Sequence, residues 1–215
     1  MAAKNIELKT LIFTIGLVVA VEVGLKWVLE PDIFHPIAFL GVVRLLEIVL
    51  LLLLVHFSES KGLKSIGIRK NRLADGLKTG GIWSAVFGIL AALSFAGLYV
   101  LTGISPSELV RSGVPSSIGA IFLFYLVGGI VSPVAEEIVF RGILYGFLRR
   151  WGFLAALLVS TLLFVLAHTT GRQIPIPQIV GGFVFALAYE REKNLVVPVV
   201  IHILGNLAIF TLSII

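Results

Sequence analysis

Long apolar stretches recur along the 215-residue chain and constrain its fold more than any other feature. Crossing the hydrocarbon core of a bilayer takes about 20 helical residues. We therefore predict an all-α fold, a polytopic transmembrane helix bundle of about seven spans. The predicted helices are Thr10–Leu29, Pro36–Phe57, Gly80–Thr102, Ser117–Arg150, Phe153–His168, Gln178–Glu190 and Leu195–Ile215.

The stretch Ser117–Arg150 is too long for one upright span. Its Ser132-Pro133 pair is typical of an N-cap followed by the first residue of a new helix. An alternative with eight helices, in which a separate segment begins at this pair, therefore stays open.

Composition excludes several classes of protein. With 58% hydrophobic and 13% charged residues and a mean hydropathy of +1.08, a soluble domain or a disordered chain is excluded. The chain has no cysteine, so disulfides, thiolate catalysis and cysteine-based metal sites are excluded as well. In a membrane protein the net charge of +5 indicates orientation in the bilayer, and we expect lipids rather than nucleic acid as partners.

Basic residues are distributed unevenly between the predicted loops. With seven spans, one side would carry Lys4, Lys9, the Ser58–Thr79 loop, Arg149, Arg150, Arg191 and Lys193. The other side would carry only Arg111 and Arg172. Because short loops rich in Lys and Arg stay in the cytoplasm, the N-terminus is predicted to be cytoplasmic.

Charged residues inside the first two predicted spans come in pairs. Glu22 and Lys26 are four residues apart, and Arg44 and Glu47 are three apart. At these spacings the two side chains of each pair share a helix face. We interpret both pairs as structural ion pairs.

The fourth predicted helix carries two adjacent carboxyls, Glu136 and Glu137. Glu137 lies four residues before Arg141 and can pair with it. Glu136 points about 140° away from Arg141 and has no partner on its own helix. A carboxyl of this kind suits a general base, although a hydrogen bond to another helix would also explain it.

Three further polar residues lie at a matching depth. At 1.5 Å per residue, Glu136 lies about 20 Å from the basic edge of the membrane and His168 roughly 25 Å. His202 and Asn206, which are four residues apart, lie roughly 14–20 Å from it. A Glu and a His can together activate a water molecule, and an imidazole and an amide can donate to an oxyanion. This layer is therefore a candidate site for hydrolysis of an amide bond.

Three motifs, Glu136-Glu137-x-x-x-Arg141, Phe164-x-x-x-His168 and His202-x-x-x-Asn206, occur in this order. Together they resemble the CAAX protease and bacteriocin-processing family. That family includes type II CAAX prenyl endopeptidases and proteins similar to lysostaphin resistance protein A. By this resemblance, residues 117–210 form a catalytic core, and residues 1–116 form an N-terminal three-helix membrane region with a basic cytoplasmic loop.

The resemblance implies a role for each residue of the motifs. Glu136 and His168 would activate water, and His202 and Asn206 would stabilise the oxyanion. Glu137 and Arg141 would support the site. The implied activity is that of an intramembrane endopeptidase that cleaves a membrane-associated peptide, either prenylated or a leader peptide.

Other functions stay open at this level. Zn²⁺ held by Glu136, His168 and His202 is an alternative, but we favour a glutamate-type mechanism without a metal because no His-Glu-x-x-His motif is present. A transporter is less well supported because no inverted repeat is found. A non-catalytic scaffold or immunity protein of the same fold is the remaining alternative.

Overall fold

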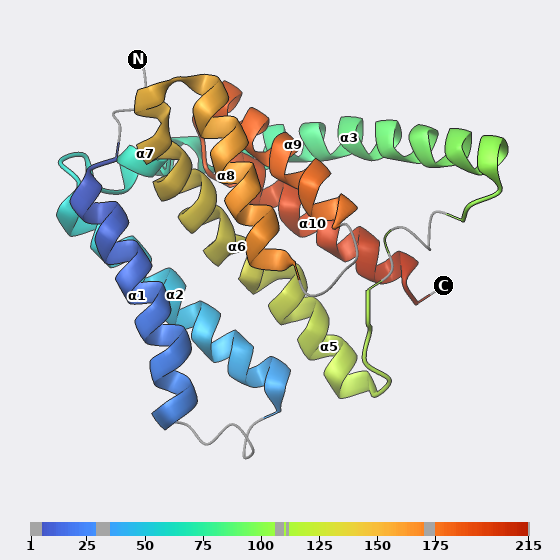
Figure 1. Ribbon diagram of the computed structural model, residues 1–215, viewed down its shortest axis with the longest axis horizontal. Helices are drawn as coiled ribbons and strands as arrows, with labels where there is room; N and C mark the ends of the chain where they lie inside the picture. The colour runs from blue at the N-terminus through green and yellow to red at the C-terminus, as the bar shows by residue number, and fades with distance from the viewer. Residues whose placement is uncertain (1–5, 29–34, 106–109, 111, 170–174, 215) are drawn as a thin grey trace.

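A computed structural model describes residues 6–28, 35–105, 110, 112–169 and 175–214 of the protein. These residues form an all-α membrane helix bundle and contain no strand, which confirms the predicted fold class. Its helices lie on both sides of one long helical rod (Figure 1). They are α1 (Leu8–Val28), α2 (Pro36–Ser58), α3 (Leu73–Thr102), α8 (Phe153–His168), α9 (Ile176–Glu192) and α10 (Val196–Leu212).

The long rod, Ile118–Trp151, is here called the central helix. The side chain of Ser117 caps it by accepting a hydrogen bond from the N–H of Ala120, and the chain turns after it at Gly152, which has a φ of 102°. The rod consists of α5 (Ile118–Leu126), a π-helical η3 (Val127–Val131), α6 (Ser132–Glu137), a π-helical η4 (Ile138–Tyr145), α7 (Gly146–Leu148) and η5 (Arg149–Trp151).

The central helix runs without a break through the Ser132-Pro133 pair. Val131 and Ser132 both have right-handed helical dihedral angles. A separate segment beginning at this pair is therefore not what the structure shows. Instead of ending, the helix accommodates Pro133 by widening into η3 immediately before it.

Four helical stretches among the described residues are long and apolar enough to cross a membrane. They are Leu8–Leu25, Pro36–Ser58, Gly62–Thr102 and Ile118–Trp151. The helices α8 and α10 are apolar but have only 16 and 17 residues. At 1.5 Å per residue they are about 24–26 Å long, shorter than a hydrocarbon core of about 30 Å.

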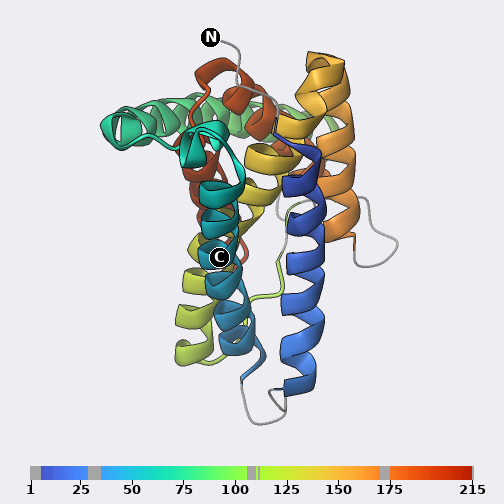
Figure 2. The ribbon, with the colours of Figure 1, turned by 90° about the vertical axis from the view of Figure 1, so that its left-hand side faces the viewer.

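Helix α3 differs from its prediction in where it begins. It starts at Leu73 rather than Gly80, after two short 3₁₀ helices, Gly62–Ile66 and Lys70–Arg72. Its first turns include Asp75 and Lys78, which hydropathy assigns to a loop although charged residues are compatible with a helix. Figure 2 shows α3 lying across one end of the bundle, at a large angle to α1 and α2.

Close approach of α3 to α10 depends on two glycines. A Cβ at Gly76 would lie 2.7 Å from the Cβ of Val196, and a Cβ at Gly80 would lie 2.7 Å from that of Val200. Side chains at these positions would therefore force the two helices apart. The packing ties the N-terminal region to the helix that carries two candidate site residues.

Several residues used in the sequence predictions lie outside the described part of the chain. These are Lys4, Arg111 and Arg172, together with the side chain of Lys26. The predicted Glu22–Lys26 pair therefore falls on a side chain outside the described residues.

Candidate active site

The central helix buries one ion pair completely. Glu137 and Arg141 have no exposed side-chain surface, and Arg141 Nε lies 3.4 Å from Glu137 Oε2. Arg141 also donates from Nη2 to the carbonyl of Gly182 in α9 at 3.2 Å. Its guanidinium lies 4.5 Å from the ring centre of Phe164 and 5.4 Å from that of Phe185. The aromatic faces thus help to hold this cation away from water.

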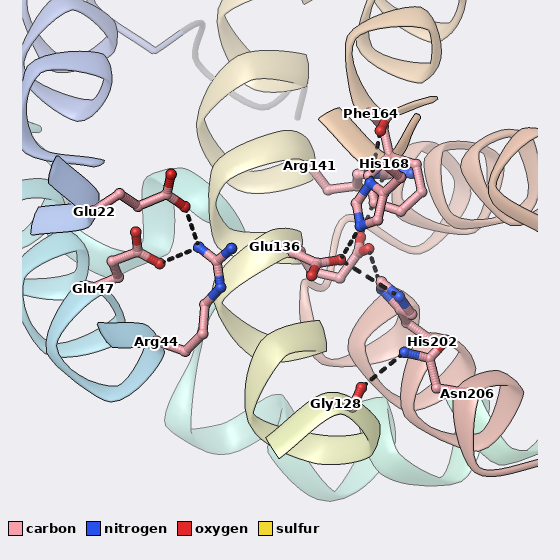
Figure 3. A network of polar contacts seen from close by, with 11 residues as sticks. Glu22, Arg44, Glu47, Gly128, Glu136, Arg141, Phe164, His168, His202 and Asn206 are labelled. Atoms are coloured by element: carbon pink, nitrogen blue, oxygen red, sulfur yellow. Dashed lines mark hydrogen bonds and ion pairs between the residues drawn. The ribbon is translucent and has the colours of Figure 1, made fainter. Parts of the chain in front are cut away.

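Glu136 leaves the central helix toward α8 and α10 (Figure 3). Its Oε2 lies 3.2 Å from Nε2 of His168 and 3.7 Å from Nε2 of His202. We call Glu136, His168 and His202 the Glu–His cluster. The structure thus brings together three residues from three helices that the sequence placed at one depth.

The tautomer of His168 follows from its backbone contact. Its Nδ1 lies 2.8 Å from the carbonyl oxygen of Phe164, which can only accept a hydrogen bond. Nδ1 therefore carries a proton, and Nε2 is the atom that faces Glu136. A carboxylate and a bare Nε2 would repel each other at 3.2 Å, so this contact requires one proton shared between Glu136 and His168.

The imidazole of His202 is held in place through Nδ1, the ring nitrogen that does not face Glu136. Its Nδ1 lies 2.9 Å from Glu137 Oε1, and its ring stacks on that of Phe185 with centroids 4.5 Å apart. Glu137 therefore bridges Arg141 and His202. From the sequence, only Arg141 was predicted as a partner of Glu137. His202 was not, because it comes from a helix 65 residues further along the chain.

Asn206 lies beside His202 on α10, and its side chain already has one partner. Its Nδ2 donates to the carbonyl of Gly128 in the central helix at 3.0 Å (Figure 3). An amide NH₂ group has two N–H bonds, so one remains to donate elsewhere. Asn206 is therefore fixed in orientation and keeps a free donor.

A second charged group lies in α1 and α2. Arg44 Nη1 lies 3.0 Å from Glu22 Oε1 and 2.6 Å from Glu47 Oε2. We call Glu22, Arg44 and Glu47 the N-terminal ion cluster. The Arg44–Glu47 pair is present as predicted, but Glu22 contacts Arg44 across the two helices, which the sequence did not indicate.

A third group ties the central helix to the end of α9. Glu190 accepts hydrogen bonds from the Tyr145 hydroxyl at 2.6 Å and from two nitrogens of Arg149 at 2.8 and 2.7 Å. Lys193 adds an ion pair with Glu190 at 2.7 Å. From the sequence alone, Arg149 and Lys193 indicate only the orientation in the membrane. They also fix α9 against the helix that carries Glu136.

The alternative function predicted for the Glu–His cluster was the binding of Zn²⁺. Among the described residues, no group of three or more His, Asp or Glu side chains is arranged to hold a metal ion. Glu136 Oε2 instead contacts Nε2 of His168 and Nε2 of His202 directly, at 3.2 and 3.7 Å.

Comparison with known proteins finds a family for the second half of the chain. Residues 118–208 match the family described as type II CAAX prenyl endopeptidase Rce1-like. The chain is 33% identical over 132 residues to the membrane-embedded CAAX protease MroQ of Staphylococcus aureus (strain USA300), with 58% of this chain and 50% of that protein aligned. It is 30% identical over 143 residues to the putative membrane peptidase YdiL of Bacillus subtilis (strain 168), with 64% and 58% aligned.

The chain spans about half the length of these two curated relatives. No solved structure gives a significant match. The family match confirms the resemblance read from the three motifs and supports a membrane protease role. The protein is an integral membrane protein, as its apolar helices and this family indicate.

Proposed function

Since residues 118–208 are similar to type II CAAX prenyl endopeptidases, we propose that this protein is an intramembrane endopeptidase. It would hydrolyse a peptide bond in a membrane-associated peptide, with Glu136 and His168 activating the water. The observation that carries the proposal is the 3.2 Å contact between Glu136 Oε2 and His168 Nε2, with the other ring nitrogen of His168 bonded to a backbone carbonyl.

In this mechanism Glu136 accepts a proton from a water molecule as the water oxygen attacks the substrate carbonyl. The proton is shared with His168 and then passes to the leaving amine nitrogen. Water is consumed, the peptide C–N bond breaks, and a carboxylic acid and an amine leave. Since one direct contact joins the two groups, the proton moves between them without an intervening water molecule.

His202 and Asn206 would stabilise the negative oxygen of the tetrahedral intermediate. Glu137 is paired with Arg141 and accepts from Nδ1 of His202. The Nε2 of His202 therefore carries a proton only when the ring is an imidazolium. In the imidazolium form, Nε2 of His202 lies on the Glu136 side of the ring and can donate to the oxyanion. Donors already aimed at a developing charge lower the barrier without reorganisation.

The test of this proposal is cleavage in ¹⁸O-labelled water by the purified protein in lipid nanodiscs. The substrates are prenylated CAAX-type peptides, the same peptides without the prenyl group, and leader peptides with a lipid anchor. We expect one class to yield a product whose new carboxylate contains ¹⁸O, and Glu136→Gln to form this product at least about 10²-fold more slowly.

The matched control is Glu7→Gln, since Glu7 is half-exposed near the N-terminus and, among the described residues, forms an ion pair with Lys9 alone. This variant is expected to cleave at the wild-type rate. If folded wild-type protein cleaves no member of the three classes, the proposal is wrong and the scaffold alternative gains support. The same assay identifies whether the substrate is prenylated.

We further propose that the N-terminus is cytoplasmic, on the distribution of basic residues. Because the chain has no cysteine, single cysteines report orientation directly. In the exposed loop after α2, Ser60→Cys should react with a membrane-impermeant maleimide only after the cells are opened. Labelling of this cysteine on intact cells would contradict the proposal and place the N-terminus outside the cytoplasm.

A further inference from the structure

The central helix carries a backbone acceptor without a donor in its own helix. In η3 the N–H of Ser132 bonds to the carbonyl of Val127, five residues back. The carbonyl of Gly128 would receive a bond from Ser132 in an α-turn or from Pro133 in a π-turn. Ser132 donates elsewhere and Pro133 has no N–H. The Gly128 carbonyl is therefore left open by the helix.

The helix α10 reaches this carbonyl because the contact surface is made of glycine. A Cβ at Gly129 would lie 2.7 Å from Leu207 Cδ2, and one at Gly128 would lie 3.4 Å from the ring of Phe210. At this separation the side chain of Asn206 spans the gap and donates from Nδ2 to the Gly128 carbonyl at 3.0 Å.

The hydrogen bond from Asn206 to the Gly128 carbonyl also fixes the orientation of the Asn206 side-chain amide. A carbonyl oxygen can only accept, so it selects the Nδ2 end of Asn206 and rejects the Oδ1 end. Without this acceptor, the amide could rotate by about 180° and present an oxygen where a donor is needed. An oxygen in that place would repel an oxyanion instead of stabilising it.

We infer that Pro133 is a positioning residue for Asn206. By withholding a backbone N–H, Pro133 keeps the Gly128 carbonyl open, and this carbonyl fixes the donor end of the Asn206 amide. The inference rests on the proposed function for its catalytic consequence. Its structural part, the dependence of the Asn206 amide on Pro133, stands or falls independently of any activity.

The variant that tests the inference is Pro133→Ala, which restores an N–H at position 133. This N–H competes with Asn206 for the open carbonyls of η3 and allows the helix to return to α-geometry. Since alanine is the best helix former, the variant is expected to fold. We expect kcat to fall roughly 10-fold, which is less than the 10²–10³-fold loss typical of removing an oxyanion donor entirely. KM should change by less than about 2-fold, because substrate binding is untouched.

A double-mutant cycle separates positioning from a general structural effect. In an Asn206→Ala background, Pro133→Ala should lower kcat no further, because the residue through which it acts is gone. Pro36→Ala is the matched control, since Pro36 lies at the exposed start of α2. This substitution should leave kcat unchanged in both the wild-type and the Asn206→Ala background. An equal loss from Pro133→Ala in both backgrounds, or no loss in either, would overturn the inference.

A spectroscopic measurement tests the structural part without a substrate. The chain has four asparagines, so the side-chain NH₂ signals of ¹⁵N-asparagine-labelled protein can be assigned with an Asn206→Ala sample. In Pro133→Ala, the two Asn206 amide protons should move toward free-amide shifts and exchange faster with water, whereas those of Asn194 should not change. Unchanged Asn206 signals would refute the inference even if the proposed activity is present. Shifted signals in a protein without peptidase activity would retain it and refute the proposed function alone.

Discussion

The N-terminal ion cluster and the Glu–His cluster are both carboxyl-containing groups in apolar helices, but their partners differ. In the first, two carboxylates contact one guanidinium, at 3.0 and 2.6 Å. In the second, one carboxyl contacts two imidazoles, at 3.2 and 3.7 Å. Figure 3 shows the two clusters in one view, with the central helix between them.

The difference lies in what each partner can do with a proton. A guanidinium stays charged in a protein, so Arg44 can neutralise Glu22 and Glu47 but cannot exchange protons with them. An imidazole gains and loses a proton near neutral pH, so His168 can share one with Glu136. Charge in an apolar helix is therefore not by itself a sign of catalysis. The chemistry of the partner distinguishes an ion pair from a proton-transfer pair.

The largest expected effect is on catalysis and is confined to the Glu–His cluster. Glu136→Gln should lower kcat by about 10²–10⁴-fold, since a glutamine cannot accept the proton of water. Glu47→Gln should leave the rate per folded molecule within about 3-fold, because Arg44, with which it forms an ion pair, takes no part in proton transfer. Initial rates in nanodiscs measure both. Comparable losses in the two variants would remove the distinction between the clusters.

A smaller loss is expected from the oxyanion donors. Asn206→Ala should lower kcat by about 10²–10³-fold with little change in KM, because it removes one donor of two. Asn206→Asp should not restore the rate, since a carboxylate in place of the amide offers no N–H to the oxyanion. A rate for Asn206→Ala within 2-fold of wild type would show that the Gly128 contact is its only role.

Stability should distinguish the fully buried arginine from the partly exposed one. Arg141→Ala should lower the free energy of unfolding by about 3–5 kcal/mol, since it leaves Glu137 buried without its cation. Arg44→Ala also leaves Glu47 without its cation but should cost less, roughly 1–3 kcal/mol, because the Arg44 side chain is 21% exposed and water can reach the space that it vacates. Thermal unfolding in detergent shows which of the two variants loses more stability. A larger loss from Arg44→Ala would contradict this prediction.

The smallest effect should come from Glu22→Gln. Its hydrogen bond to Arg44 can persist through the amide oxygen, and the half-exposed pair contributes about 0–1 kcal/mol. The melting temperature should move by no more than a few degrees, and cleavage should be unchanged. A marked loss of activity would show that the N-terminal ion cluster takes part in substrate handling.

The sequence allowed good prediction where residues are close along the chain or fixed by depth. The Glu137–Arg141 contact follows from helical spacing, and the meeting of Glu136 with His168 follows from counting residues from the membrane edge on both arms of a hairpin. Both distances are set by the rise of a helix, which does not depend on tertiary packing.

Contacts that depend on helix rotation and on local distortion were not predictable in the same way. The Glu137–His202 bond requires the angular position of α10 about its axis, which apolar side chains all around that helix do not reveal. The widening at η3 was not predicted, and a helix start at Ser132-Pro133 stayed open as an alternative, because Pro133 after Ser132 fits an N-terminus as well as a distorted interior. The contact of Glu22 with Arg44, between α1 and α2, was not predicted for the first of these reasons.

The most direct test of the account is cleavage by protein without metal, because it asks whether the Glu–His pair itself activates water. Purified protein is treated with a chelator, its zinc content is measured by mass spectrometry, and the cleavage rate is measured on the same sample. We predict that protein with less than about 0.1 equivalent of metal keeps most of its activity, and that the rate falls at low pH as Glu136 takes up a proton. One equivalent of zinc whose removal abolishes cleavage and whose return restores it would contradict the account and make Glu136, His168 and His202 metal ligands.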